Sequence, residues 1–221
     1  MAISDNLAAI RMELPDTVRL VAVSKFHPVA TLMDAYGAGQ RVFGESRVQE
    51  LVAKQPLMPA DVEWHFIGTL QTNKVKYIAP FISMIHSVDS VRLLQEIDRR
   101  AAEAGRTIRA LIETHVAEET TKHGFGIDEC LEFFRDGGGS RFANVEICGL
   151  MGMATFTDDM EQVRREFRAL KQLFEEIRAL PETDKSVFRE LSMGMSDDYH
   201  IAIEEGSTMV RIGTKIFGGR T

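Results

Sequence analysis

Residues 19–25 read RLVAVSK, an unbroken apolar run that ends in a serine and a lysine. A run that is rich in valine is typical of a strand buried on both faces of a parallel sheet. Lys25 is therefore expected at the carboxyl end of a strand, which is where parallel α/β folds carry their ligands. A lysine that leaves an apolar run can be partly neutral, and a neutral amine can form a Schiff base with a carbonyl group. The alternative is a solvated lysine that only ends the strand.

Seven further strand-like segments follow this one, and helix-like segments separate them. The eight expected strands cover residues 18–24, 41–43, 63–67, 82–86, 107–114, 145–150, 187–191 and 208–212. This alternation, with no break in composition, predicts one domain over residues 1–221 with the α/β fold of a TIM-type (β/α)8 barrel. An extra helix is expected at residues 2–12, before the first strand. A doubly wound parallel sheet is the alternative architecture.

The longest expected helix, at residues 158–180, has the clearest periodicity in the chain. Apolar side chains recur on one face at three- and four-residue spacing, and arginines and glutamates lie opposite. The apolar face consists of Met160, Val163, Phe167, Leu170, Phe174 and Ile177. Because the stripe is too short for a sustained coiled coil, it predicts a helix that covers a sheet.

Composition and charge argue against several classes of protein. The formal net charge is -7 and no basic stripe stands out, which argues against a nucleic-acid-binding surface. The amino-terminal segment carries Asp5 and lacks a long apolar core, so neither a signal peptide nor a membrane span is expected. Cys130 and Cys148 show no CxxC spacing and fit a reducing compartment. The sequence therefore predicts a cytoplasmic protein.

Two other patterns carry little functional signal. The six histidines form no HxxxH or HxH pair, so no metal site is expected. Gly137-Gly138-Gly139 lacks the lysine that follows the glycines of a P-loop. A flexible connection is expected there.

Polar residues follow the seventh and eighth expected strands. Residues 192–196 read SMGMS and residues 210–214 read VRIGT. Serine hydroxyls, a glycine that admits close approach to the backbone and the start of a helix are what a phosphate group needs. In (β/α)8 barrels the loops after these two strands are the usual phosphate site. The alternative is an ordinary loop in which Ser196 caps a helix that begins at Asp197.

Arg211 interrupts the eighth apolar strand. Its guanidinium cannot lose its charge, so the side chain must either point outward or find an acceptor. A bound ligand would provide such an acceptor.

These segments together resemble the family of pyridoxal phosphate homeostasis proteins (YggS/PROSC type), which is related in fold to the N-terminal barrel of alanine racemase. The similarity spans most of the chain, and several long motifs occur in the family's order. The motifs are AVSK (22–25), FGESRVQE (43–50), WHFIGTLQTNK (64–74), GLMGM (149–153), LSMGMS (191–196) and VRIGTKIFG (210–218).

The resemblance implies that pyridoxal 5'-phosphate (PLP) is the cofactor and that Lys25 carries it as a Schiff base, the internal aldimine. It also implies a cofactor-binding set drawn from the motifs. This set consists of Lys25, Ser46, Asn73, Ser192, Met193, Ser196, Arg211, Gly213 and Thr214.

Within this set the resemblance assigns two roles. The phosphate is expected to lie among Ser192, Ser196, Gly213 and Thr214. Arg211 is expected to face the pyridine nitrogen. A permanent cation there disfavours protonation of the ring, which makes the ring a weaker electron sink. The resemblance also offers Lys122 as a second amine near the mouth of the site.

Three positions depart from the family pattern. Ser46 stands where the family usually has asparagine, and a hydroxyl has fewer donors than an amide. Thr114-His115 replaces a common valine-asparagine pair. Ala154-Thr155 follows Met153, where the family has a proline.

Three functions remain to be compared. The first is a protein that buffers and delivers PLP in intracellular vitamin B6 homeostasis without robust turnover, with PLP-dependent apo-enzymes among its partners. The second is a PLP-dependent amino acid racemase or lyase with Lys25 as its single base, since the second domain whose tyrosine is the other base of alanine racemase is not expected here. The third is a cofactor-free Schiff-base aldolase. A monomer is expected, because no extra apolar patch stands out.

Overall fold

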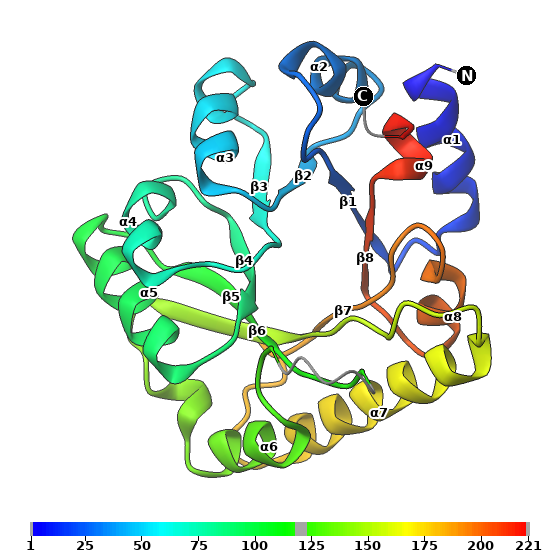
Figure 1. The fold of residues 1–221 in the computed structure, drawn as a ribbon. Coiled ribbons are helices and arrows are strands. Elements are labelled where there is room, and N and C mark those ends of the chain that lie inside the picture. Colours follow the sequence, from blue (N-terminus) through cyan, green and yellow to red (C-terminus); the bar gives the residue numbers. More distant parts are fainter. Residues whose placement is uncertain (1, 118–122, 220–221) are drawn as a thin grey trace.

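Eight parallel strands close into a barrel in which consecutive strands pair and β1 pairs with β8 (Figure 1). The computed structural model describes residues 2–117 and 123–219. The strands are β1 Arg19–Val23, β2 Val42–Glu45, β3 Glu63–Phe66, β4 Met84–Val88, β5 Ile108–Glu113, β6 Val145–Met151, β7 Glu190–Ser192 and β8 Met209–Ile212. The predicted (β/α)8 barrel is confirmed, and the doubly wound alternative is wrong because the sheet closes on itself.

Helices surround the barrel on its outer side (Figure 1). The α-helices are α1 Ile3–Glu13, α2 Val29–Gly37, α3 Val48–Lys54, α4 Val75–Ile78, α5 Val91–Glu103, α6 Ile127–Arg135, α7 Met160–Ala179, α8 Tyr199–Glu204 and α9 Thr214–Phe217. The short 3-10 helices of the described residues are η1 Gln55–Leu57, η2 Thr72–Lys74 and η3 Gly138–Ser140. The expected amino-terminal helix is α1, which packs against α2 and α9. The sequence did not predict α9.

The long helix α7 buries most of the face that its periodicity predicted. The buried apolar residues of α7 are Val163, Phe167, Leu170, Leu173, Phe174 and Ile177. Met160 is an exception, with 39 % of its surface exposed. It is the first residue of the helix and precedes Val163, where the buried face begins.

Strand β7 is shorter than its apolar sequence suggested. Val187 and Phe188 were expected in the strand, but their amide groups donate to the carbonyl oxygen of Asp184 at 3.1 and 2.8 Å. The Asp184 carboxylate also accepts hydrogen bonds from the amide and hydroxyl of Ser186. This local turn uses the backbone groups that a longer strand would need.

The triple glycine is packed, which differs from the expected flexible connection. Gly138 is buried in η3, and a Cβ atom there would lie 2.4 Å from the Phe133 side chain. Only glycine fits against the ring, so the segment forms a compact turn.

The interior of the barrel has an apolar layer and a polar layer. Its apolar cluster consists of Val21, Met84, Leu111, Cys148, Met151 and Met209. A hydrogen bond also crosses the interior from His86 on β4 to Ser192 on β7, two strands that are not neighbours. Within residues 2–117 and 123–219, no helix combines the length and apolar character that a bilayer crossing requires.

Candidate functional site

Lys25 follows β1 directly, at the carboxyl end of the strand, as the sequence predicted. Its side chain is partly buried, whereas Ser24 before it is fully buried. The amide of Ser24 donates to the carbonyl oxygen of Gly44 on β2 at 3.0 Å, so the chain continues along the barrel wall up to the lysine. Lys25 therefore starts from a fixed position on the rim.

Three side chains from β2 and α3 hold the backbone on both sides of Lys25, and we call Glu45, Glu50 and Lys54 the clamp. Lys54 Nζ lies 2.7 Å from Glu45 Oε1 and 2.6 Å from Glu50 Oε1. Lys54 also donates to the carbonyl oxygen of Ser24 at 2.8 Å. Glu50 accepts a hydrogen bond of 2.7 Å from the amide of Phe26. The residues before and after Lys25 are thus both bound by one charged cluster.

The clamp also stabilises an unusual backbone conformation. Phe26 has a φ of 69°, the left-handed region that side chains other than glycine rarely adopt. Such a conformation costs on the order of 1–2 kcal/mol and persists where surrounding contacts hold it. The Glu50 contact to its amide is such a restraint. The turn at Phe26 directs the chain away from the strand immediately after Lys25.

Burial of the clamp changes the pKa of one of its two carboxyl groups. Glu45 is fully buried, and desolvation raises the pKa of its carboxyl, against smaller opposing effects of Lys54 and Ser24. The clamp was not predicted from the sequence. The only available signal was the i,i+4 spacing of Glu50 and Lys54 after a strand that ends in Glu45.

Gly213 and Thr214 lie beside the strand that carries Lys25. The register of β1 and β8 pairs Ala22 with Ile212, so the next residues continue side by side. A Cβ atom on Gly213 would lie 3.1 Å from the carbonyl oxygen of Val23, which shows how closely the two backbones approach. Thr214 is exposed and Gly213 partly so. The structure brings these two predicted residues to the same part of the rim as Lys25.

Ser196 lies on the neighbouring loop, after β7. The amide of Arg211 on β8 donates to the carbonyl oxygen of Gly194 at 3.0 Å, which ties this loop to β8. Helix α8 begins at Tyr199 with Asp198 as the preceding residue, so the expected cap by Ser196 of a helix that begins at Asp197 is wrong. Ser196 is partly exposed at the rim.

Arg211 points inward and its acceptors belong to the protein. It is 4 % exposed and donates to the backbone and hydroxyl oxygens of Ser192 at 2.9 and 2.6 Å. It also donates to the carbonyl oxygen of Gly152 at 3.1 Å. Burial lowers its pKa to about 10, and the carboxylates of Asp198 and Glu113 oppose this shift. The guanidinium is still charged at neutral pH.

Ser192 and Met193 lie deeper than the sequence analysis expected. Both side chains are fully buried. The hydroxyl of Ser192 is bonded to Arg211 and lies 3.0 Å from His86 Nδ1, and Met193 belongs to the main apolar core. This geometry favours a supporting role for both residues below the rim.

Ser46 and Asn73 follow β2 and β3. Ser46 borders a pocket of about 240 Å³ together with Gln49, Thr69 and Lys74. A Cβ atom on Gly68 would lie 2.3 Å from the Ser46 carbonyl oxygen, so the two loops are in close contact. Asn73 is exposed in η2, next to Lys74. The remaining predicted amine, Lys122, lies outside the described residues.

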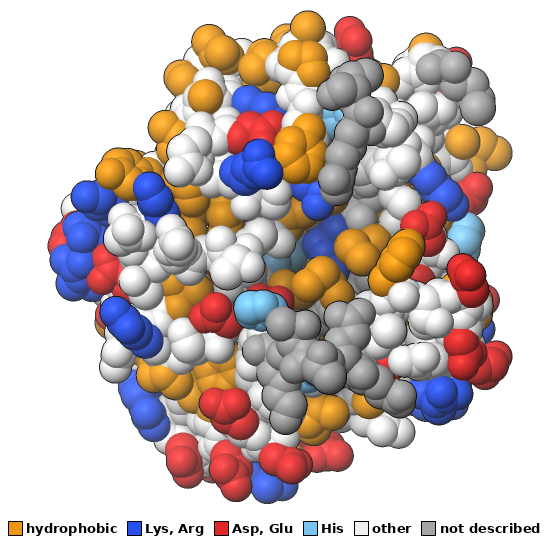
Figure 2. Space-filling view, viewed as in Figure 1, with side chains coloured by type: hydrophobic (Ala, Val, Ile, Leu, Met, Phe, Trp, Pro, Cys, Tyr) orange, Lys and Arg blue, Asp and Glu red, His pale blue; other side chains and the backbone are white. Residues whose placement is uncertain are grey.

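A second groove opens at the ends of β5, β6 and β7. It has a volume of about 340 Å³ and is lined in part by Glu113, His115, Met153, Phe156 and Met195. Figure 2 shows that this end of the molecule is hollowed near its centre, with basic and histidine side chains at the base of the hollow. Among the described residues, no group of three or more His, Cys, Asp or Glu side chains is placed to hold a metal ion.

The chain is similar to a known protein family over its whole length. Residues 1–221 match the family model "Alanine racemase, N-terminal domain". A pyridoxal phosphate homeostasis protein of Aquifex aeolicus is 41 % identical over 208 residues, which cover 91 % of this chain and 87 % of that protein.

Solved structures agree with this result. PipY of Synechococcus elongatus is 37 % identical, and the match covers 98 % of this chain and 100 % of PipY. The TM-score is 0.91 for PipY without PLP and 0.88 for PipY with PLP bound. Alanine racemase of Clostridium difficile, at 14 % identity and a TM-score of 0.79, shares the fold, and the match covers 99 % of this chain and 56 % of the racemase.

Proposed function

The chain belongs to the family of pyridoxal phosphate homeostasis proteins, which have the alanine racemase N-terminal domain, and we propose that it binds PLP as a Schiff base on Lys25 and buffers and delivers it. The observation that carries this proposal is the meeting of Lys25, Gly213 and Thr214 where β1 and β8 end. The PLP-bound structure of PipY, a relative that is matched over its whole chain, supports the choice of ligand.

The rim residues fit a phosphorylated aldehyde. Gly213 leaves the backbone open where a Cβ atom would come within 3.1 Å of the Val23 carbonyl oxygen. Ser196 carries a hydroxyl group on the loop after β7, and Thr214 carries one at the start of α9, next to this glycine. Hydroxyls together with backbone amides are suitable donors to a phosphate. Lys25 is partly buried beside them, and its amine can form a Schiff base with a carbonyl carbon.

When bound, PLP supplies an aldehyde that condenses reversibly with amines and a ring that withdraws electrons. The clamp fixes the backbone around Lys25 and so fixes the point from which its side chain would reach the ligand. Ser196, Gly213 and Thr214 hold the phosphate end. These contacts make binding firm while the covalent bond to Lys25 stays reversible.

Arg211 supports a carrier over an efficient catalyst. In the proposed complex its guanidinium faces the pyridine nitrogen, and it stays protonated at neutral pH although burial lowers its pKa to about 10. A cation at this position disfavours a proton on the ring nitrogen and so weakens the ring as an electron sink. We therefore propose that turnover of amino acids is slow.

We also propose that the protein acts in the cytoplasm. Cys130 and Cys148 are free and buried, which supports a role in the reducing cytoplasm. The partners would be PLP and PLP-dependent apo-enzymes, and the carrier would act as a monomer.

The visible absorption spectrum of the purified protein tests the proposal. We expect a band in the visible or near-ultraviolet range when PLP is added, its loss on reduction with borohydride, and a reduced adduct that maps to Lys25. A protein that PLP cannot colour would contradict both PLP functions and favour a cofactor-free aldolase. Robust exchange of the α-proton of a preferred amino acid would instead favour the racemase or lyase.

A further inference from the structure

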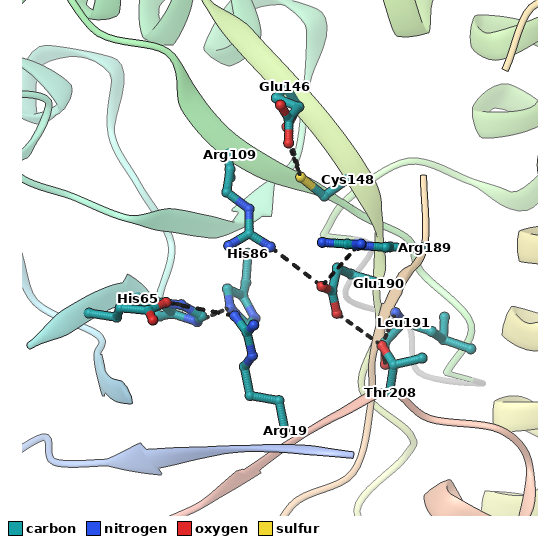
Figure 3. Close-up of polar contacts among 11 residues, drawn as sticks. Arg19, His65, His86, Arg109, Glu146, Cys148, Arg189, Glu190, Leu191 and Thr208 are labelled. Carbon is teal, nitrogen blue, oxygen red and sulfur yellow. Dashed lines mark hydrogen bonds and ion pairs between the residues drawn. The ribbon is translucent and has the colours of Figure 1, made fainter. Parts of the chain in front are cut away.

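A continuous hydrogen-bonded chain runs through the barrel interior and ends at Arg211. His65 Nδ1 lies 2.9 Å from His86 Nε2, and His86 Nδ1 lies 3.0 Å from Ser192 Oγ. Ser192 Oγ lies 2.6 Å from Arg211 Nη1. All four side chains are at most 4 % exposed. Figure 3 shows the two imidazoles pointing toward each other from β3 and β4.

The chemistry of Arg211 sets the direction of this chain. A guanidinium has donors only, so the oxygen of Ser192 must accept from it. The hydroxyl proton of Ser192 is then available to donate to His86 Nδ1. His86 keeps its own proton on Nε2 and donates it to His65 Nδ1. In this arrangement the hydroxyl of Ser192, both ring nitrogens of His86 and Nδ1 of His65 each form a hydrogen bond.

The hydrogen-bonded chain that starts at Arg211 ends near the carboxylate of Glu63, at the other end of the barrel. With Nδ1 of His65 accepting, its proton is on Nε2, which lies 4.0 Å from Glu63 Oε2. This nitrogen is buried and has no hydrogen-bond partner among the described protein atoms. The distance is too long for a direct hydrogen bond, so the hydrogen-bonded path ends at His65.

Both histidines are held neutral, which the direction of donation requires. Burial lowers the pKa of His65 to about 3, and the nearby Arg19 and Arg109 add to this effect. Burial also lowers the pKa of His86 well below its ordinary value, and Arg211 contributes. A charged His86 would turn a second donor toward the Ser192 oxygen.

We infer that His65, His86 and Ser192 are positioning residues that hold the guanidinium of Arg211 in place to face the pyridine nitrogen of bound PLP. Among the described residues Arg211 has three acceptors, and Ser192 supplies two of them. His86 orients the Ser192 hydroxyl so that its lone pair faces the guanidinium. The hydrogen-bonded chain is a property of the protein alone. Its role toward the ring rests on the function proposed above.

The first test needs no ligand. Long-range proton-nitrogen NMR of histidine-labelled protein should show a proton on Nε2 and a bare Nδ1 for both His65 and His86, with Nδ1 of His86 shifted by the hydrogen bond. In Ser192→Ala the nitrogen shift of His86 Nδ1 should move to that of an unbonded ring nitrogen. A proton on Nδ1 of His86 in the wild type would contradict the inferred direction of the hydrogen bonds. An unchanged nitrogen shift of His86 Nδ1 in Ser192→Ala would contradict its hydrogen bond to Ser192.

The second test measures how tightly PLP is held and where bound PLP absorbs. Ser192→Ala should lose PLP about fivefold more readily than the wild type and should alter its visible absorption band, because a hydrogen bond to a charged group is lost. Ser207→Ala is the matched control: this serine is also buried, but it bonds the carbonyl oxygens of Leu191, Met193 and Met209. It should destabilise the fold without changing the band.

Replacement of His86 gives a graded comparison. His86→Asn places an amide near the position of Nδ1 and should retain most of the wild-type band, whereas His86→Leu should behave as Ser192→Ala does. Equal spectra for Ser192→Ala and Ser207→Ala would overturn the positioning role while leaving PLP binding intact. A wild-type protein that takes up no PLP would overturn the proposed function and, with it, the contact of Arg211 with the ring. The NMR result would still show whether the hydrogen bonds between Arg211 and His65 exist.

Discussion

Lys54 donates a hydrogen bond of 2.8 Å to the backbone carbonyl oxygen of Ser24, the residue before Lys25. One buried lysine thereby holds the backbone of another lysine in place. The ammonium of Lys54 is also paired with Glu45 and Glu50, and Glu45 is fully buried. Stability and the position of Lys25 are coupled at this point.

Removing the charge of Lys54 should destabilise the fold strongly. Lys54→Met leaves Glu45 without its cation in a buried position, and breaking such a pair costs about 3–5 kcal/mol. Urea unfolding measures the loss. The exposed Lys76 provides the control, since Lys76→Met should change stability by at most about 0.5 kcal/mol. A double variant with Glu45→Leu should recover part of the loss, and a double variant as unstable as the sum of both single changes would argue against the pair.

Lys25→Ala should abolish the covalent adduct but not all binding. The contacts at Ser196, Gly213 and Thr214 do not depend on the lysine, so PLP should still bind, at least tenfold more weakly. Borohydride reduction followed by mass spectrometry detects the adduct, and Lys74→Ala is a control for a lysine elsewhere on the rim. An undiminished adduct in Lys25→Ala would identify another lysine, such as Lys122, as the carrier.

Gly194→Ala should damage both the loop after β7 and the fold. Gly194 has a φ of 96°, and an added Cβ atom would lie 2.6 Å from the Cβ atom of Ala202. We expect a loss of about 2–4 kcal/mol from strain and overpacking together. Gly105→Ala separates the two causes, because Gly105 also has a positive φ of 62° but nothing lies within 4 Å of its Cβ position. Equal losses in thermal unfolding would show that packing at Ala202 does not matter.

Acid should destabilise the protein through its buried imidazoles. The pKa of His65 is depressed to about 3 in the folded state from 6.5, so the unfolded chain binds more protons between these values. The contribution of His65 to stability is complete above pH 6.5 and is lost as the pH falls toward 3. The slope should reach about 1.4 kcal/mol per pH unit for each such histidine.

His65→Asn should remove the share of this slope that belongs to His65. Urea unfolding at several pH values between 7.5 and about 4.5 compares the two proteins over the range in which the folded wild type resists protonation. The variant should be less stable at pH 7.5 but should lose less of its remaining stability on acidification. Parallel curves for the wild type and the variant would contradict the assignment.

The barrel could be predicted because its signals are local. Apolar runs and the 3.6-residue period depend on neighbouring residues, and they gave the positions of β1 and α7 to within about two residues. The start of β7 could not be predicted in this way. Asp184 and Ser186 compete there for the backbone groups of an apolar segment. Four-residue α9 is too short to show any period.

The site was predictable only where strand order determines it. Closure of the barrel makes β1 and β8 neighbours, which brings Lys25 and Gly213 together. The clamp and the buried chain depend instead on contacts between residues 30 and 106 positions apart, Ser24 with Lys54 and His86 with Ser192. No spacing in the sequence marks such pairs, which is why Ser192 was expected on the rim.

Closure of the sheet also determines how another protein can approach this one. The backbone donors and acceptors of β1 and β8, which would form the two free edges of an open sheet, are bonded to each other from Arg19 and Met209 onward. An incoming polypeptide therefore has no strand edge among these eight strands to extend. An apo-enzyme that receives PLP in the proposed hand-over would therefore contact side chains and loops of this protein, and the hand-over would be specific to their shape.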